Sequence, residues 1–336
     1  MKQLFLILSF VMLPLTGNAT VSIYLRYEDS LQKIMESQYP NVLKQDHSLK
    51  IEGHMNFDDL KYLRSKMVGD GDEWIEELDL DSIGIEMPIG DNGNDIANLD
   101  YLKDINIHVY KYKDVLHDLG LDYLFADEGK YYSDDEIMRS YMFYGCNRLR
   151  HLILPYSIRC IGSFCVAYCE NLERLEFTNN HPTSSRGGFP LGVQDIRPLA
   201  VYHCPKLREV TLSYYLKTIS TKAFAECDAL ERVYITNDYC PPAYGYNCFP
   251  HPEKIQLVVV ENYPHDMASK YANAPGWNRF GSITTMTQEE YIATTVSSVR
   301  SQAQPQQDIY NLNGHRLTGK PSKGVYIEDG RKIVGK

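Results

Sequence analysis

The sequence lacks the features that mark several classes of function. It has no cluster of Lys and Arg, and its formal net charge is −10, so nucleic acid is not an expected partner. Beyond the N-terminal segment, no stretch is apolar enough to cross a bilayer. It also lacks a Gly-x-Ser-x-Gly elbow, a His-Glu-x-x-His pair, a phosphate-binding loop and a dinucleotide fingerprint. No catalytic residue and no cofactor is therefore predicted, and the chain is not expected to be an enzyme.

The N-terminus has the pattern of a secretory signal peptide. Lys2 supplies a positive charge, and the apolar run from Leu4 to Leu15 is too short to span a membrane. Small residues precede position 20, and we expect cleavage after Ala19. The alternative is a short buried helix. The pattern predicts a protein that is secreted or reaches the outer cell surface, with residues 1–19 as its signal peptide.

A block of 23 residues repeats along the middle of the chain. Each copy follows the pattern Cys-x-x-Leu-x-x-Leu-x-Leu, with Val, Ile or Phe at some apolar positions, and begins at Cys146, Cys169, Cys204 or Cys227. Positions 146 and 169 are 23 apart, as are 204 and 227, while 169 and 204 are separated by one period plus 12 residues. A period of this length indicates one supersecondary unit per copy, stacked into a solenoid.

The repeat predicts an α/β-type solenoid with a mostly parallel β-sheet on its concave face. The Leu-x-Leu part alternates apolar and polar residues, as a strand with one buried face does. Weaker copies at 76–80 and 102–107 keep this core. The expected organisation is a helical N-terminal cap at 20–75, the solenoid at 76–285, a polar linker at 286–307 and a small β-hairpin unit at 308–336.

The cysteines divide into two groups. Four of the eight occupy the same repeat position, where we expect free thiols packed in the core. Cys240 and Cys248 lie outside the repeat and are the best candidates for a disulfide. Cys165 and Cys169 are four positions apart, but the repeat turns Cys169 inward, so no metal site is predicted. The acidic segments 70–73 and 91–95 do not match the spacing of a calcium loop and are interpreted as turns.

The unit AFAECDALERVYI, preceded by LKTIS, resembles the leucine-rich repeats of BspA-like surface proteins of Bacteroidota. The segment LKIEGHMNFDDLKYLRSKM is similar to the cap that precedes those repeats, and VVVENYPHDMASKYANAPGWNRFGSI is similar to their terminal unit. The stretch 308–336 resembles the C-terminal sorting-type tail of secreted Bacteroidota proteins. The resemblance covers roughly residues 30–336 and implies a secreted or surface protein that acts in adhesion or protein binding.

The outward positions of successive strands form the candidate binding surface. They stack into one face of the predicted sheet, which suits a protein or peptide partner. The alternative is a merely solvated face. Its candidate ligand-binding residues are Asp104, Asn106, His151, Ile153, Arg174, Glu176, Glu209, Thr211, Arg232 and Tyr234, with Glu77 and Asp79 in the same pattern.

The tyrosines of the return path and an insertion in the repeat are two further candidate binding surfaces. The chain has 26 Tyr against 11 Phe, and Tyr156, Tyr214 and Tyr215 lie on the predicted return path. Tyr combines an apolar body with a polar tip and is useful on binding surfaces, although packing between coils is the alternative. The insertion at 179–193 is too long for the repeat and is either a functional loop or a tolerated insertion.

Together these features predict a secreted or cell-surface leucine-rich-repeat protein that mediates protein–protein interaction or adhesion. Its partner would be a host, bacterial or matrix protein bound by the concave sheet. A surface glycan-binding or structural repeat protein that uses exposed Tyr side chains is the alternative. The oligomeric state is left open by the sequence.

Overall fold

The computed structural model describes most of the solenoid and several shorter segments. The described residues are 21–85, 137–138, 141–177, 192–237, 240–241, 247–261, 266–294, 309–311, 316–317, 324–328 and 331–335. They fall into two compact units, one of residues 20–288 and one that contains residues 289–336. Each unit is described by itself below.

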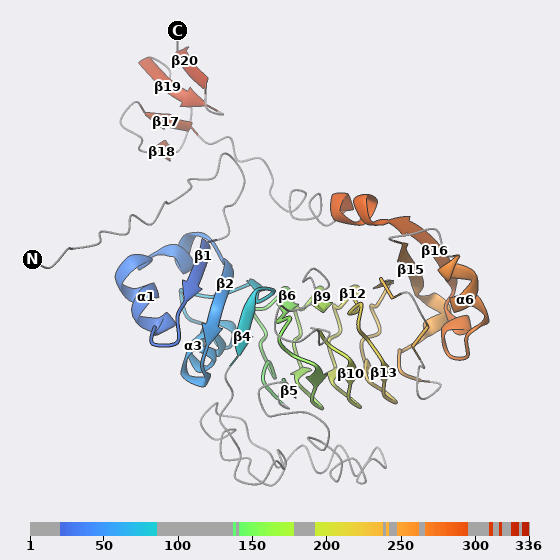
Figure 1. The fold of residues 1–336 in the computed structure, drawn as a ribbon. Helices are drawn as coiled ribbons and strands as arrows, with labels where there is room; N and C mark the ends of the chain where they lie inside the picture. The colour runs from blue at the N-terminus through green and yellow to red at the C-terminus, as the bar shows by residue number, and fades with distance from the viewer. Residues whose placement is uncertain are drawn as a thin grey trace, which may run out of the picture. The chain divides into compact units, whose positions relative to one another are not determined.

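A ten-stranded parallel sheet, here called the main sheet, runs the length of the larger unit (Figure 1). Its order is β1 (Val21–Leu25), β2 (Ser48–Met55), β3 (Glu77–Asp79), β6 (His151–Leu154), β9 (Arg174–Phe177), β12 (Glu209–Thr211), β14 (Arg232–Ile235), β15 (Gln256–Glu261) and β16 (Ser282–Thr287), with β4 (Ile83–Ile85) paired to β2. The strands predicted from the four Leu-x-Leu repeats are thus present as β6, β9, β12 and β14.

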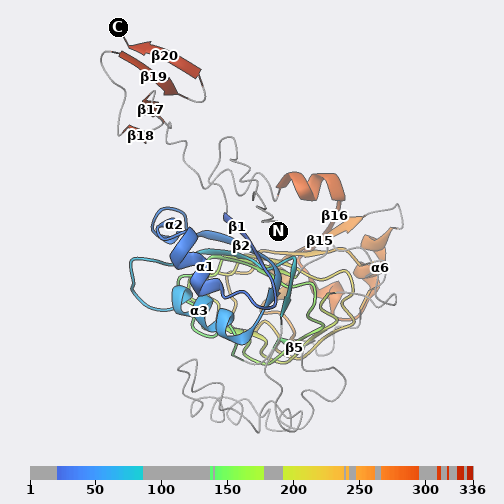
Figure 2. The same cartoon turned by 60° about the vertical axis from the view of Figure 1, so that its left-hand side comes forward.

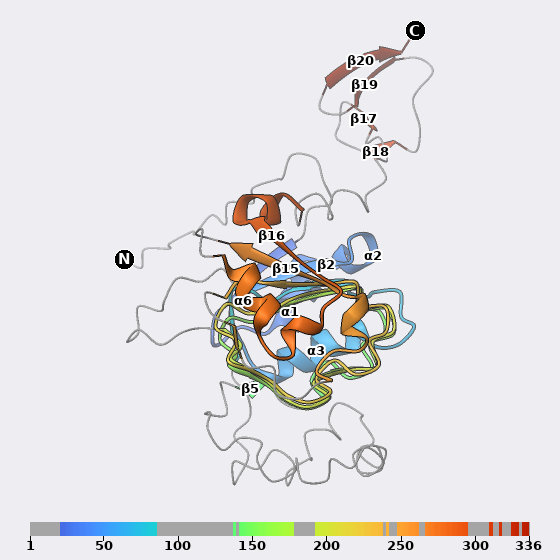
Figure 3. The ribbon, with the colours of Figure 1, turned by 90° about the vertical axis from the view of Figure 1, so that its right-hand side faces the viewer.

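Two smaller parallel sheets complete each coil. One has the order β13 (Thr218–Ile219), β10 (Asp195–Ile196), β7 (Cys160–Ile161) and β5 (Ile137–Met138), and the other pairs β11 (Val201–Tyr202) with β8 (Val166–Ala167). Viewed from the end, the coils lie over one another as similar loops (Figure 3). The apolar positions eight before each repeat cysteine, which the sequence analysis assigned to no strand, form the first of these sheets.

The core lies inside the coils. Inward side chains of the main sheet, such as Leu152, Leu175, Val210 and Val233, are fully buried. The repeat cysteines are buried beside them, as predicted. Burying a Leu or Val side chain contributes about 1.5–3 kcal/mol each, so the repeated apolar positions supply most of the driving force for stacking.

The N-terminal cap extends the main sheet as well as covering its end. It contains α1 (Leu31–Gln38), α2 (Val42–Gln45) and α3 (Phe57–Met67), seen together in Figure 2. Its strand β1 pairs in parallel with β2, and β2 pairs in parallel with β3. A capping box starts α3: the Asn56 side chain accepts from the Asp59 backbone, and Asp59 accepts from the Asn56 backbone. Helix α3 lies within the helical cap that the sequence predicts at 20–75.

Arg64 of α3 fastens the cap to the first coil. Its guanidinium is 7% exposed and donates to the backbone oxygens of Met142, at 3.2 Å, and of Tyr144. These carbonyl oxygens accept hydrogen bonds from the buried guanidinium. Burying its charge without such partners would lower the stability of the fold. The link joins segments 78 or more positions apart in the chain, so it holds the cap in one orientation on the solenoid.

The C-terminal part of the larger unit contains η3 (Pro252–Lys254), α6 (Met267–Asn273) and η4 (Trp277–Arg279). Trp277 is buried and donates from its indole Nε1 to the Pro241 backbone oxygen at 2.7 Å. It also stacks on Phe280. This cluster closes the core at the end of the solenoid, where the sequence places Trp277 and Phe280.

The smaller unit contains an antiparallel sheet in the order β18 (Arg316–Leu317), β17 (Ile309–Asn311), β19 (Gly324–Glu328) and β20 (Arg331–Gly335). Strands β19 and β20 pair on either side of Asp329-Gly330, one of the two turn signals in the sequence. Residues 288–294 are also helical, at the start of the stretch that the sequence analysis assigned to a linker.

Two glycines with nearly the same backbone geometry give a test of how closely the cap packs. Gly53 has φ of 93°, and a Cβ there would lie 2.1 Å from the Leu25 backbone oxygen of β1. Gly69 has φ of 94° and nothing within 4 Å of a Cβ. Both substitutions introduce left-handed backbone strain, but only Gly53→Ala adds a steric clash. Gly53→Ala should therefore lower the free energy of unfolding by about 2 kcal/mol or more beyond the loss in Gly69→Ala. Urea denaturation of both variants measures the difference, and equal losses would contradict this packing of β1 against β2.

Candidate functional site

The outward side chains of the main sheet lie in two rows set by the strand register. The first row runs through Glu77, His151, Arg174, Glu209, Arg232 and Gln256. The second runs through Lys50, Asp79, Ile153, Glu176, Thr211, Tyr234 and Val258. Every candidate residue from β6 to β14 thus lies on this one surface, called the sheet face below.

Side chains of opposite charge pair along and between these rows. Arg174 lies 3.1 Å from Glu176 and 3.4 Å from Glu209, and Arg232 bonds to the same Glu209 carboxylate. His151 Nε2 lies 2.8 Å from Glu176 Oε1. Adjacent strands are about 4.8 Å apart, so equivalent positions of neighbouring coils are in direct contact. The charges on the face are therefore engaged with one another.

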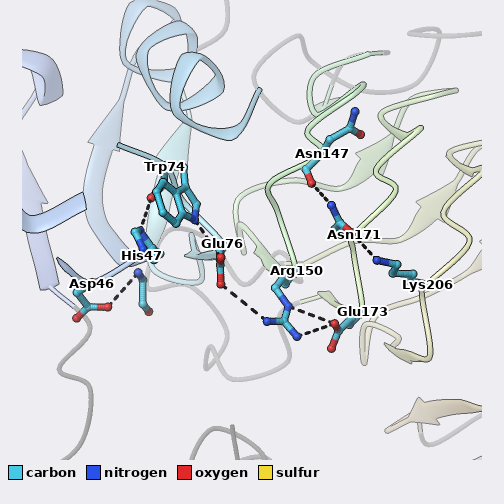
Figure 4. Close-up of polar contacts among 10 residues, drawn as sticks. Asp46, His47, Trp74, Glu76, Asn147, Arg150, Asn171, Glu173 and Lys206 are labelled. Atoms are coloured by element: carbon cyan, nitrogen blue, oxygen red, sulfur yellow. Dashed lines mark hydrogen bonds and ion pairs between the residues drawn. The ribbon is translucent and has the colours of Figure 1, made fainter. Parts of the chain in front are cut away.

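A further row of charges, separate from the two rows of the sheet face, lies just before each strand begins (Figure 4). Arg150 lies 3.9 Å from Glu76 and donates from Nε and Nη2 to Glu173 Oε1, at 3.2 and 2.7 Å. The hydrogen bond to Glu173 is the largest cause of a raised Arg150 pKa. Opposite charges thus alternate from coil to coil at this edge, as they do on the sheet face.

Amides continue this pattern in the adjacent turns (Figure 4). Asn171 donates from Nδ2 to the Asn147 backbone oxygen at 2.6 Å and accepts from Lys206 Nζ at 2.7 Å. The three residues come from three successive coils. Polar side chains in this row link each coil to the next, which is a structural role.

The cap end of the same edge carries an aromatic stack (Figure 4). The rings of His47 and Trp74 lie 3.7 Å apart and nearly parallel, and Trp74 Nε1 donates to Glu76 Oε1 at 2.9 Å. The Arg148 guanidinium lies 5.2 Å from the centre of the Trp74 ring, within the range of a cation–π contact. These contacts tie the first coil to the cap.

The sheet face is tightly packed. The side chains of His151, Arg174, Glu176 and Glu209 are only 16–17% exposed, whereas Arg232 is 43% exposed. Burial raises the pKa of Tyr234, and the nearby Glu209 carboxylate raises it further, so its phenol is neutral at physiological pH. Burial acts to lower the pKa of Arg232, but the hydrogen bond and charge of Glu209 raise it overall. The face therefore offers rigid, hydrogen-bonded side chains to a partner.

The polarity of the face changes toward its C-terminal end. Thr211, Tyr234, Val258 and Val260 point outward yet are buried, at 2–7% exposure. Ile153, nearer the cap, is half-buried between Asp79 and Glu176 in its row. In the second row, the partly exposed side chains therefore lie over β2 to β9, where polar and charged side chains surround one apolar position. In the first row, Arg232 of β14 is also exposed.

Two predicted members of the face stay predictions. Among the described strands, β3 pairs directly with β6. The pairing brings Glu77 and Asp79 next to His151 and Ile153. Asp104 and Asn106 lie outside the described residues, as do the acidic turn at 91–95 and the insertion at 179–191.

The Tyr residues predicted on the return path form a small aromatic contact. Tyr214 and Tyr215 pack edge to face with ring centres 5.0 Å apart, and both are half-buried. Tyr156, at the equivalent position of an earlier coil, is also half-buried. Packing of these rings is the interpretation that the contact favours.

The cysteines are free thiols in the structure, including Cys240 and Cys248, the pair that the sequence singled out for a disulfide. The thiol of Cys169 donates to the Phe143 backbone oxygen at 3.0 Å, and those of Cys204 and Cys227 contact equivalent oxygens of the preceding coils. Cys248 instead contacts the Ile219 oxygen at 3.3 Å, and burial raises its pKa to about 12. The repeat cysteines thus serve as small buried donors between coils.

A pocket of about 190 Å³ lies in the cap between α1, α2 and α3. Apolar and aromatic side chains line it, together with an ion pair in which Lys66 Nζ lies 2.6 Å from Glu73. That hydrogen bond is the largest cause of a lowered Glu73 pKa, and burial raises the pKa of Tyr62 to about 12. The Lys66 and Glu73 charges are paired with each other, and Tyr62 is neutral. Glu36 also lines the pocket and accepts a hydrogen bond from Gln32 Nε2 at 2.9 Å.

Within the described ranges, no three His, Cys, Asp or Glu side chains come together in a way that could hold a metal ion. Among the same residues, no helix is both long and apolar enough to cross a membrane.

The family model agrees with the repeat geometry. Residues 135–239 match the model of the BspA type leucine-rich repeat region, in six copies. Among solved structures, the chain is similar to the crystal structure of the pneumococcal vaccine antigen PcpA, with 14% identity, 72% of this chain and 60% of that chain covered, and a TM-score of 0.29. The chain thus spans about 60% of that structure's length. None of the curated proteins matches the sequence.

Stacked parallel coils, each with one short strand and inward leucines at a fixed spacing, define a leucine-rich-repeat solenoid. Residues 135–239 are a leucine-rich repeat region of the BspA type. Repeats of this family are typically non-enzymatic and typically bind proteins.

The paired charges generate a stability prediction. Glu209→Gln keeps the size of the side chain but removes the charge shared by Arg174 and Arg232, and should lower the free energy of unfolding by roughly 1–3 kcal/mol. Glu170→Gln, at an exposed turn position, is the matched control and should change it by less than about 0.5 kcal/mol. Chemical denaturation compares the two variants. Equal stabilities would show that the Glu209 carboxylate contributes nothing to the solenoid.

Proposed function

We propose that the protein is exported and that it binds a protein partner through the sheet face, as an adhesion or interaction protein at the cell surface or outside the cell. The observation that carries the proposal is the sheet face itself, a continuous registered surface of polar side chains around Ile153. The BspA-type repeat supports both protein binding and an extracellular or surface location.

The structure favours a particular mode of recognition. Because Arg174, Glu176 and Glu209 are already paired and mostly buried, little side-chain freedom remains to be lost when a partner docks. Partly exposed groups such as Ile153 and the Lys50–Asp79 pair, whose charged atoms are 3.4 Å apart, provide the accessible contacts. Affinity would come from shape complementarity and from burial around these groups rather than from unpaired charge.

Ile153→Lys tests this mode of binding without breaking a charge pair. The new ammonium would lie between Asp79 and Glu176, so the fold should be retained, while the apolar contact is lost and a strongly hydrated charge is added. The full exported chain captures proteins from host and bacterial extracts, and mass spectrometry identifies them. These proteins should bind the Ile153→Lys variant at least tenfold more weakly than the unchanged chain.

Gln38→Lys adds the same side chain at an exposed position of α1, away from the sheet face, and should leave capture unchanged. Thermal unfolding of both variants should stay close to that of the wild type. Capture that survives Ile153→Lys would remove the sheet face from the proposal.

Export gives a separate prediction. In a host with a general secretion pathway, the protein recovered outside the cell should begin at Thr20, and Leu8→Arg should keep it inside because a charge interrupts the apolar run of the leader. Mass spectrometry of the recovered chain measures the N-terminus and shows whether residues 308–336 are removed at the surface. An extracellular chain that still begins at Met1 would contradict cleavage after Ala19.

A further inference from the structure

A stripe of aromatic side chains crosses the coils at the corner beside β8 and β11, away from the sheet face. The stripe, named here the tyrosine stripe, consists of Tyr144, Tyr168, Tyr202, His203 and Glu226. The ring centres of Tyr144 and Tyr168 are 5.1 Å apart, those of Tyr168 and Tyr202 are 5.5 Å apart, and those of Tyr168 and His203 are 4.9 Å apart. Tyr144, Tyr168 and His203 are partly exposed.

The stripe is built on a left-handed backbone position that recurs in every repeat. This position precedes the repeat cysteine and is occupied in turn by Gly145 (φ 67°), Tyr168 (φ 54°), His203 (φ 51°) and Glu226 (φ 59°). Glycine adopts this conformation freely, whereas other residues lose roughly 1–2 kcal/mol there. Three of the four coils thus carry a large or charged side chain where the backbone favours glycine, and residues in such strained conformations cluster at functional sites.

Hydrogen bonds between coils hold these residues in place. The backbone nitrogen of Tyr168 donates to the Tyr202 oxygen at 2.9 Å, and that of His203 donates to the Ala225 oxygen at 3.0 Å. The backbone of the stripe is therefore fixed by the solenoid, and its side chains project from a rigid frame.

Glu226 places an oriented carboxylate at one end of the stripe. The Tyr202 hydroxyl donates to Oε1 at 2.7 Å, and His203 Nδ1 lies 2.7 Å from Oε2. Partial burial acts to raise the pKa of Glu226, but the hydrogen bonds from Tyr202 and His203 outweigh it and lower the pKa overall. The side chain is half exposed, and a carboxylate accepts up to about four hydrogen bonds, so it keeps capacity for a ligand.

The opposite end of the stripe is less suited to a cation. Arg64 donates to the Tyr144 backbone oxygen and lowers the pKa of the Tyr144 phenol, although burial raises that pKa overall. A second positive group near Tyr144 would be repelled by this guanidinium. The part of the stripe formed by Tyr168, His203 and Glu226 is therefore the favourable part.

We propose that Tyr168, His203 and Glu226 form a second binding site, distinct from the sheet face, for an arginine side chain of a basic peptide segment. An aromatic face attracts a guanidinium through a cation–π contact, and a carboxylate binds the same group through charge-assisted hydrogen bonds. The net charge of −10 attracts basic segments and repels acidic ones.

The ring geometry distinguishes this ligand from a neutral sugar. Successive rings of the stripe are tilted by 51°, 73° and 37°, so they do not form the flat platform on which a sugar ring stacks. A planar guanidinium can lie against one ring while its edge reaches the carboxylate, because its donors project in the plane of the group. A glycan is therefore an outcome of the test rather than the expected ligand.

The test uses the full exported chain and the peptide Ac-Gly-Arg-Gly-Arg-Gly-NH2 in isothermal titration calorimetry at low salt. The same peptide with citrulline in place of arginine is nearly isosteric and neutral, and maltohexaose is the glycan probe. The arginine peptide should bind at least tenfold more tightly than the citrulline peptide, and maltohexaose should not bind. Equal binding of the two peptides, or binding of maltohexaose in place of the arginine peptide, overturns the proposal.

Matched variants locate the site. Glu226→Gln keeps the size of the side chain and one acceptor oxygen but removes the charge, and should weaken binding at least fivefold, whereas Glu36→Gln on the exposed side of α1 should not. Tyr168→Phe keeps the aromatic face and should retain binding, whereas Tyr168→Leu should lose it. Unchanged affinity in both Glu226→Gln and Tyr168→Leu overturns the assignment, with thermal unfolding confirming that each variant is folded.

The two surfaces can fail separately. Ile153→Lys on the sheet face should leave binding of the arginine peptide unchanged, and Glu226→Gln should leave capture through the sheet face unchanged if different partners use the two surfaces. Loss of arginine-peptide binding in a folded Ile153→Lys variant would place the peptide on the sheet face and overturn the assignment to the tyrosine stripe.

Discussion

The register of the parallel strands is the constraint on which the rest of the structure depends. It places equivalent residues of successive coils side by side, about one strand spacing apart, on all faces of the solenoid. The nearest neighbour of a side chain is therefore the residue at the same repeat position in the next coil. Like charges at one position would repel along the whole sheet, so each repeat position is constrained by its counterparts 23 residues away.

The chain meets this constraint differently on each surface. Inside, identical small thiols and branched side chains stack without conflict, because they carry no charge. At the strand entry, charges alternate in sign through Glu76, Arg150 and Glu173. On the sheet face, Arg174 and Arg232 flank Glu209. At the corner of the tyrosine stripe, tyrosine rings pack against one another at an angle and one carboxylate ends the series. The strand register thus produces an apolar core, rows of alternating charges and an aromatic surface.

Much of the architecture follows from the repeat pattern alone. The strands β6, β9, β12 and β14, their inward leucines and the buried cysteines are all predicted by the 23-residue period. The same period, applied to the charges, could also have indicated the pairs between neighbouring coils, since Arg150 and Glu173 occupy one position in adjacent copies. The sequence analysis instead treated each outward residue as independently available to a partner.

Other features depend on contacts that the repeat pattern does not encode. Strand β3 pairs directly with β6 although β4 lies between them in the sequence, because strand order is set by which edges meet and not by sequence order. Arg64 joins the cap to backbone oxygens, which leave no signal in side-chain patterns. The left-handed residues Tyr168, His203 and Glu226 are likewise invisible to hydrophobic periodicity.

Pairing of the charges changes what the sheet face requires of a partner. If the arginines were free, a partner could gain affinity by supplying carboxylates, and binding would weaken steeply with salt. Since Arg174 is held by Glu176 and Glu209, a competing carboxylate must displace an existing one, and the net gain is small. Selectivity on this face must then come from fit to a rigid surface, whereas the half-exposed Glu226 keeps a charge that can still attract a ligand. The division between an internally neutralised face and a charged aromatic corner is the basis of our proposal that the solenoid recognises two different chemistries.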